Sequence, residues 1–248
     1  MSRNCGIFLL RESAMATAER LAECLGADIV QPGQDERARE LFRQRFQTRK
    51  RWVLLMSVGI AVRFIDGLAA DKKTDPAVVV LDEGCHHAVS LLSGHEGGAN
   101  DLAFAVANAV GATPVITTAT ESLKPLVVGI GCRKGVSAEA IEDAVCNALG
   151  ERQLSEVRCL ASIDLKAEEP GLLEFSRKHN LPLRIFMRES VAARAWVTAP
   201  SAWVRSVTGA DGVSEPCALM ASPRGQLLVP KSSKNGVVVA IVEDMVAS

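Results

Sequence analysis

Short aliphatic segments alternate with amphipathic segments along the whole chain, and this alternation constrains the fold more than any other feature. Near-continuous apolar runs occur at Trp52–Ser57, Ala77–Asp82, Leu126–Gly131 and Gly236–Val242. Runs of this length are typical of strands that are buried on both faces of a sheet. The segments between them carry helix-capping residues and end at glycines. The alternation therefore predicts an α/β fold, with helices packed on the faces of a layered sheet.

The pattern divides the chain into two parts. Residues Ala119–Pro125 are short and polar and end in proline, and a new strand pattern starts at Leu126. We therefore predict two domains, residues 1–122 and 126–248, each a mostly parallel sheet with flanking helices. Within the first, Ala77–Asp82 and His86–Leu92 are separated by a short Glu-Gly-containing turn, which indicates a hairpin.

Composition excludes several classes of function. The net charge is −1, so there is no overall basic field that would hold nucleic acid. The seven cysteines form no Cys-x-x-Cys pair and are odd in number, which argues against a disulfide framework and a structural zinc site. No apolar run reaches the ~20 residues of a membrane span, so we expect no membrane association. A reducing cytoplasm is the expected compartment.

The segment Leu91–Asn100 is the most informative one for chemistry. It connects a predicted strand to a predicted helix and is rich in glycine, so its backbone can approach a ligand closely. Free amides at the start of the helix can bind an anion, and His95 could act as a general acid or base. A glycine turn with a solvated histidine explains the same residues. The candidate residues are Ser93, His95, Glu96, Gly97, Gly98 and Asn100.

Other loops at predicted strand ends supply further candidates. They carry glycines for close approach and basic side chains that could hold carboxylates. The candidates are Gly59, Arg63 and Lys72 in the first part, and Gly131, Cys132, Arg133, Asp164, Lys166 and Lys231 in the second. The alternative explanation is a set of solvated surface charges and, for Cys132, an inert thiol.

Cys85, His86 and His87 invite comparison with a metal site. Adjacent residues on a strand face opposite sides of the sheet, so His86 and His87 are not expected to bind the same metal ion. We therefore predict no metal held by the protein.

Several of these segments together resemble the CbiG family, the cobalt-precorrin-5A hydrolases of cobalamin biosynthesis. In the first part the resemblance rests on Gly59-Ile-Ala-Val-Arg63, Asp71-Lys-Lys-Thr-Asp-Pro76, Asp82-Glu-Gly84, Ser90-Leu-Leu-Ser-Gly-His95 and Gly97-Gly-Ala-Asn100. In the second it rests on Gly129-Ile-Gly-Cys-Arg133, Ala161-Ser-Ile-Asp-Leu-Lys166 and Leu228-Val-Pro-Lys231, and this part also resembles CobE, a partner protein of the aerobic pathway. Family members usually carry a middle domain that is missing here, and Glu96 replaces a usual apolar residue.

The resemblance implies a cobalt-bearing macrocycle with acetate and propionate groups as substrate. The cobalt would arrive in the substrate, so no cofactor held by the protein is expected. The implied reaction opens the ring-A lactone with water and releases acetaldehyde. His95, assisted by Glu83 or Glu96, is then the candidate acid and base, with the Gly97 and Gly98 amides facing the oxyanion. A non-catalytic precorrin carrier and an assembly subunit remain alternative functions. For partners, contacts with other enzymes of the pathway and a homodimer are left open.

Overall fold

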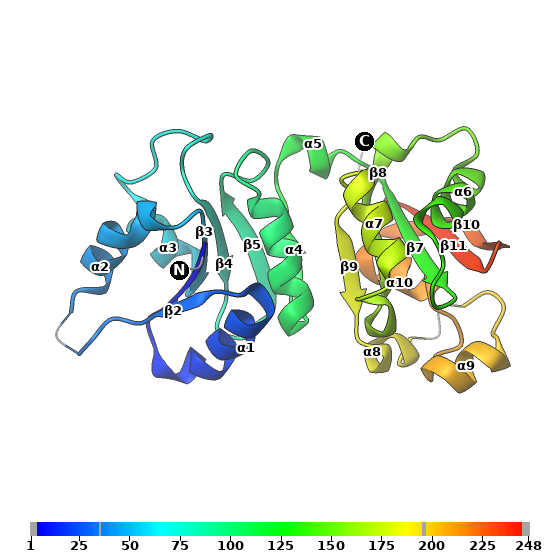
Figure 1. Ribbon diagram of the computed structural model, residues 1–248, viewed down its shortest axis with the longest axis horizontal. Helices are drawn as coiled ribbons and strands as arrows, with labels where there is room; N and C mark the ends of the chain where they lie inside the picture. The colour runs from blue at the N-terminus through cyan, green and yellow to red at the C-terminus, as the bar shows by residue number, and fades with distance from the viewer. Residues whose placement is uncertain (1–3, 35, 195–196, 245–248) are drawn as a thin grey trace. The chain divides into compact units, whose positions relative to one another are not determined.

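The computed structural model describes residues 4–34, 36–194 and 197–244 (Figure 1). The chain forms two compact units, Met1–Thr118 and Ala119–Ser248, each with its own sheet and core. The α/β class with two layered units is confirmed. Both sheets are mixed, because each contains antiparallel as well as parallel pairs. Every helix within the described residues is too short or too polar to cross a membrane.

The first unit is a six-stranded sheet with the order β2-β1-β3-β4-β5-β6. Its strands are β1 (Cys5–Leu9), β2 (Asp28–Val30), β3 (Arg51–Leu55), β4 (Ala77–Leu81), β5 (His87–Leu92) and β6 (Thr113–Val115). Neighbouring strands are parallel except for β4 and β5. The predicted hairpin is thus confirmed, with Leu81 opposite Ala88.

Helices cover both faces of this sheet. They are α1 (Met15–Leu25), α2 (Ala38–Arg45), α3 (Val58–Ile65) and α4 (Ala99–Val110). The α1 and α4 helices cover one face with alanine-rich surfaces, and α2 and α3 cover the other with an aromatic cluster around Phe42 (Figure 1). Trp52 is fully buried in that cluster and donates its indole N–H to the Phe46 carbonyl at 2.9 Å. On this second face the side chains of Val89 and Leu91 are only half-buried, so the cover is incomplete over β5.

The second unit is a five-stranded sheet with the order β10-β11-β7-β8-β9. Its strands are β7 (Leu126–Cys132), β8 (Val157–Ile163), β9 (Leu183–Phe186), β10 (Gly225–Lys234) and β11 (Val237–Asp244). The strands β7, β8 and β9 are parallel, and β11 runs antiparallel to β7 and β10.

The helices of this unit are α5 (Ala119–Ser122), α6 (Ala138–Leu149), α7 (Pro170–Lys178), α8 (Arg188–Ala192), α9 (Ala202–Thr208) and α10 (Ser214–Ala221). Residues of α6 and α7 join the main core on one face of the sheet. The α10 helix crosses so closely over β7 that a Cβ added to Gly129 would lie 1.8 Å from the Ser214 carbonyl oxygen. A glycine is therefore required at this point of the strand.

This close approach predicts the effect of one methyl group. Gly129→Ala should lower the free energy of unfolding by roughly 1–3 kcal/mol, because α10 must move away from β7. Urea unfolding followed by circular dichroism measures the change. Gly33→Ala is the matched control, since no atom lies within 4 Å of its added Cβ. Equal stability of the two variants would contradict the proposed crowding.

Candidate functional site

The antiparallel pairing of β4 and β5 separates the predicted residues of the first unit into two groups. Leu81 lies opposite Ala88, and Val78 lies opposite Leu92. The Asp82–His87 turn therefore lies at one end of the sheet and the loop after Leu92 at the other. Strands of this length place the two ends on the order of 15 Å apart, at about 3.3 Å per residue.

Glu83 and His95 consequently lie at opposite ends of the sheet. Glu83 pairs instead with Arg11, with 3.2 Å between Nη1 and Oε2. The expected assistance of His95 by Glu83 does not occur in the structure. Gly59, in the first turn of α3, also lies at the Glu83 end, because α3 follows the last residue of β3. Arg63 is exposed one turn further along α3.

The segment Ser93–Gly98, which we call the glycine loop, folds on its own carbonyl groups. The Ser93 carbonyl accepts hydrogen bonds from the amides of Gly97 at 3.1 Å and Ala99 at 3.2 Å. A Cβ on Gly97 would lie 2.5 Å from the Ser93 Cβ, and Gly98 has a φ of +81°, so both positions need glycine. Because the Gly97 amide is used inside the loop, it is not free for the oxyanion that we expected it to bind.

Asn100 closes the glycine loop and is engaged within the fold. Its Oδ1 accepts from the Ser90 hydroxyl at 2.8 Å, and its Nδ2 donates to the Thr118 hydroxyl at 3.0 Å. The side chain is 8% exposed. Asn100 therefore has a structural role in the loop, and the substrate contact expected of it stays a prediction. His95, by contrast, is exposed at the tip of the loop.

Glu96 and Lys72 form an ion pair, with 2.7 Å between Nζ and Oε1. The hydrogen bond with Lys72 holds the pKa of Glu96 below its ordinary value, and the same contact raises the pKa of Lys72. Glu96 is therefore ionised near neutral pH and is not a proton donor. The structure does place Lys72, His95 and Glu96 together at one end of the sheet.

Two buried oxygen atoms at this end of the sheet have no hydrogen-bond partner among the described residues. They are Ser93 Oγ and Asp75 Oδ1, on side chains that are 7% and 5% exposed. The other Asp75 oxygen accepts from the amides of Ala70 and Asp71 at 2.7 and 3.0 Å. A buried polar atom without a partner costs about 1–3 kcal/mol, so a bound polar group would be stabilised here. Sequence reasoning missed Asp75, because nothing in its pattern indicates burial.

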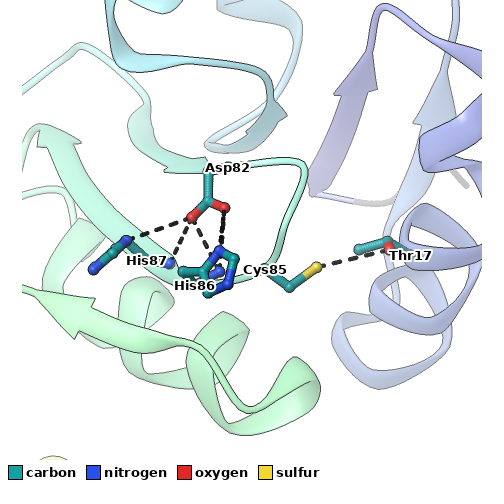
Figure 2. A network of polar contacts seen from close by, with 5 residues as sticks. All are labelled: Thr17, Asp82, Cys85, His86 and His87. Carbon is teal, nitrogen blue, oxygen red and sulfur yellow. Dashed lines mark hydrogen bonds and ion pairs between the residues drawn. The ribbon is translucent and has the colours of Figure 1, made fainter.

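The opposite end of the sheet carries a histidine pair around one carboxylate (Figure 2). Asp82 accepts from the backbone amides of His86 at 3.1 Å and His87 at 2.6 Å. Its oxygens also lie 3.3 Å from His86 Nδ1 and 3.7 Å from His87 Nδ1. Burial raises the pKa of Asp82, but the two amides and His86 outweigh it, so the pKa lies below its ordinary value.

The two histidines share this partner because His86 precedes β5. The rule that adjacent strand residues face opposite sides applies only from His87 onward. Gly84 makes room for the arrangement, since an added Cβ would lie 2.7 Å from the His86 ring. Cys85 turns away and contacts the Thr17 hydroxyl at 3.8 Å (Figure 2).

A pocket of about 240 Å³ opens beside this pair. Its walls are apolar except for Asp82 and His87. The remaining lining residues are Met56, Val58, Val80, Val89 and Val115. The pocket lies where the helical cover over β5 is incomplete.

In the second unit the structure brings most predicted residues to one end of the sheet. The parallel strands β7 and β8 are paired, with Gly129 beside Ala161, so their following loops are neighbours. Gly131, Cys132 and Arg133 thus lie near Asp164 and Lys166. Arg133 is exposed, and its amide donates to the Gly236 carbonyl at 3.0 Å.

Glu169 organises this end of the unit and was missed by the sequence analysis. Its carboxylate is buried and accepts from the Gly135 amide at 2.7 Å and from Lys166 Nζ at 2.9 Å. Burial raises the pKa of Glu169, but these two donors outweigh it, so the pKa lies below its ordinary value. The positive charge of Lys166 is therefore balanced by the Glu169 carboxylate within the fold.

Asp164 and Cys132 are also constrained. Asp164 pairs with Arg188 at 3.0 Å. Burial raises the pKa of the Cys132 thiol to about 11, against a smaller lowering by Lys166. Cys132 is thus protonated near neutral pH and is a poor nucleophile.

Lys231 faces the chain rather than a ligand. Its ammonium group donates to the Ala199 carbonyl, and its backbone amide donates to Glu215 at 3.1 Å. Glu215 is 1% exposed and also binds Thr198 through the amide at 2.9 Å and the hydroxyl at 2.5 Å. Lys231 and Glu215 together hold the Thr198–Ala199 segment, and the substrate contact expected of Lys231 stays a prediction.

Within the part of the chain that the structure describes, no three His, Cys, Asp or Glu side chains form a group that could hold a metal ion.

Comparison with known proteins identifies the family. The family model "Cobalamin synthesis G N-terminal" matches residues 40–121, and "Cobalamin synthesis G C-terminus" matches residues 126–242. The chain belongs to the CbiG family and has a role in cobalamin biosynthesis. Since only residues 122–125 separate the two matches, the expected absence of a middle domain is confirmed.

Curated relatives agree with this assignment. The chain is 27% identical to the cobalt-precorrin-5A hydrolase of Priestia megaterium, over 82% of this chain and 81% of the relative. It is 26% identical to the Salmonella typhimurium cobalt-precorrin-5A hydrolase, over 95% of this chain and 96% of the relative. Protein CobE of a Sinorhizobium species is 32% identical over 42% of this chain and 70% of its own length.

Two solved structures are similar to about half of this chain each. The CobE structure is 31% identical and covers 50% of this chain and 93% of its own, with a TM-score of 0.45. The cobalamin biosynthesis protein chiG of Agrobacterium tumefaciens is 34% identical and covers 48% of this chain and 98% of its own, with a TM-score of 0.37.

The buried Glu169 predicts a pH-dependent stability. Glu169→Gln should lower the free energy of unfolding by about 1–3 kcal/mol at pH 7, because Lys166 loses its charged partner. The folded-state pKa of Glu169 lies below its ordinary value, so its stabilisation is present above the ordinary carboxyl range and is lost as the pH falls through the folded-state pKa. Chemical unfolding at pH 7 and in acid tests both statements.

The matched control for this prediction is Glu168→Gln. Glu168 is adjacent and exposed, so its variant should unfold like the native chain at either pH. A Glu169 variant whose loss of stability is as large in strong acid as at pH 7 would contradict the electrostatic explanation.

Proposed function

We propose that this chain is a cobalt-precorrin-5A hydrolase, which opens the ring-A lactone with water and releases acetaldehyde. The extent of similarity carries the proposal. Named hydrolases align over as much as 95% of the chain, whereas CobE aligns over 42%. The similarity to hydrolases thus extends through both units, including the one that contains the glycine loop.

The glycine loop is the proposed acid–base centre. His95 is exposed at its tip, beside the ion pair of Lys72 and Glu96. In the lactone-opening step, His95 takes a proton from water as the oxygen attacks the carbonyl carbon. The bond between that carbon and the ring oxygen then breaks, and the ring oxygen receives the proton. The partnerless oxygens of Ser93 and Asp75 support the binding of a polar group at this end of the sheet.

The proposal assigns other parts of the chain to the substrate's acidic side chains. Exposed guanidinium groups such as Arg63 and Arg133 suit carboxylates, because they offer paired N–H donors. The cobalt ion would enter already bound to the substrate, and no other cofactor takes part. The chemistry required of the protein is then confined to proton transfer and to stabilising the oxyanion.

Replacement of His95 tests the role of the loop. His95→Ala should lower the rate of acetaldehyde release from cobalt-precorrin-5A by about 10²–10⁴, the usual value of general acid–base assistance. The assay is an anaerobic incubation with the acetaldehyde quantified. His179→Gln is the control, because His179 lies in the second unit and contacts Glu142. Near-native turnover by His95→Ala would remove the acid–base role from this residue.

A second candidate function is a carrier that binds a precorrin without converting it. The higher identity to CobE, 32% against 26–27% for the hydrolases, favours it.

Both functions predict that a cobalt-corrinoid carrying free carboxylates binds with an affinity that falls as salt rises, because exposed charges are screened. Absorbance titration at low and high ionic strength measures this. Tight binding with no acetaldehyde release would establish the carrier function. Salt-independent binding would exclude Arg63 and Arg133 as the groups that bind the carboxylates.

A further inference from the structure

The segment from Arg37 to Arg51 concentrates the positive charge of the chain. It contains seven basic residues and one acidic residue, so its net charge is +6, whereas the whole chain has a net charge of −1. The proposed function leaves this segment without a role. Its basic residues are Arg37, Arg39, Arg43, Arg45, Arg49, Lys50 and Arg51.

Ion pairs within the first unit engage only part of this charge. Three of the seven side chains lie within 3.4 Å of a carboxylate: Arg37 beside Glu40, Arg39 beside Asp66 and Arg49 beside Asp28. The other four side chains are exposed and form no ion pair with any described residue: Arg43, Arg45, Lys50 and Arg51. Their charge is therefore available to a ligand.

The sheet register places the start of β3 at the same end as the glycine loop. Arg51 begins β3 and lies beside Ala77, the first residue of β4. Val78 lies opposite Leu92, the last residue of β5, and the glycine loop follows directly. Neighbouring strands are ~4.8 Å apart, so Arg51 lies roughly 10 Å across the sheet from the end of β5. Lys50 precedes Arg51 at this end.

Arg43 and Arg45 reach the same end from α2, which packs beside α3 (Figure 1). The Arg43 guanidinium lies 3.8 Å from the position of a Cβ added to Gly67. Gly67 follows α3, which runs back along the sheet from the carboxyl end of β3 and spans ~12 Å. Arg45 is the last residue of α2, and the chain leads from it into β3. Both arginines therefore lie toward the amino ends of β3 and β4.

Lys73 extends this positive surface toward the glycine loop. Its neighbour Lys72 contacts Glu96 of that loop, and Lys73 itself is exposed with no ion pair in the part of the chain that the structure describes. The Asp71 carboxylate accepts the Lys73 amide at 2.7 Å, and Asp75 is buried and accepts two other amides. We call these five exposed side chains the basic rim: Arg43, Arg45, Lys50, Arg51 and Lys73.

The composition of the basic rim favours a small polycarboxylate over nucleic acid. Single-stranded nucleic acid binds through exposed aromatic rings on which the bases stack. The aromatic residues that alternate with these basic residues are Phe42, Phe46 and Trp52, and all three are buried. Guanidinium groups, by contrast, bind carboxylates through paired N–H donors and need no stacking.

We propose that the basic rim binds the acetate and propionate groups of the cobalt-precorrin and holds the macrocycle against the glycine loop. The identity of the ligand rests on the proposed function. Because the rim and His95 share one end of the sheet, a macrocycle held by its carboxylates on the rim reaches the loop. The rim residues position the substrate and take no part in proton transfer.

The test measures the binding of dicyanocobyrinic acid, a corrinoid with free carboxylates, by absorbance titration at low ionic strength. The triple variant Arg45→Gln/Lys50→Gln/Arg51→Gln should bind it about tenfold more weakly, because each exposed ion pair contributes a small factor. Dicyanocobinamide has amides in place of these carboxylates, so this triple substitution should leave its affinity unchanged.

The matched control is Arg20→Gln/Arg177→Gln/Arg224→Gln. It removes the same number of positive charges from arginines that are exposed elsewhere on the chain. Its affinity for dicyanocobyrinic acid should equal that of the native chain, so that an effect of net charge is separated from an effect of the basic rim.

A second measurement uses the native chain and does not depend on the folding of a variant. A carbodiimide activates the carboxylates of the bound corrinoid, and each activated group forms an amide with a nearby lysine while its oxygen leaves on the urea product. Peptide mapping should find the corrinoid on Lys50 and Lys73 in preference to Lys178, which is exposed on the second unit.

The proposal is overturned if native protein does not bind dicyanocobyrinic acid, if both triple variants bind it equally, or if Lys178 is labelled as readily as Lys50. Tighter binding of a single-stranded oligonucleotide, lost in the rim variant, would assign the rim to nucleic acid instead. Dicyanocobyrinic acid is not a substrate, so these results are independent of the acetaldehyde assay. Rim-dependent binding without acetaldehyde release would keep this inference and remove the proposed hydrolase activity.

Discussion

The reversal of β5 against β4 is the constraint on which the first unit depends. The Asp82 carboxylate stabilises that reversal by accepting the amides of His86 and His87 at the turn. Because β5 then runs back along β4, its carboxyl end delivers the glycine loop to the opposite end of the sheet. One hydrogen-bonded turn thus creates two separate polar sites, one around His95 and one around His87, instead of a single site.

Contacts within the fold decide which basic side chains remain unengaged. Lys72 and Lys166 form ion pairs, and the Lys231 ammonium group donates to a backbone carbonyl, although all three were expected to bind carboxylates. The exposed arginines Arg63 and Arg133 form no ion pair among the described residues. A chain with a net charge of −1 therefore presents positive charge locally, through planar guanidinium groups that suit carboxylates.

The apolar pattern predicted the strands and the main helices well, because burial on both faces leaves an unambiguous aliphatic signal. The hairpin from Ala77 to Leu92 follows this rule. The helices α8 and α9 were not predicted. They are short, and α9 buries none of its residues, so no hydrophobic periodicity marks it. Asp75 and Glu169 were missed for a related reason, since a buried carboxylate has the same sequence signal as a solvated one.

The sequence by itself determined the α/β class, the family and the residue types able to transfer protons or bind carboxylates, because these depend on local pattern and motif. Tertiary structure alone decided which of these residues meet. Strand order and direction placed Glu83 far from His95 and beside Arg11, and brought His87 to the wall of a pocket. Such contacts join residues distant in sequence, and they depend on sheet register and burial, which no local pattern encodes.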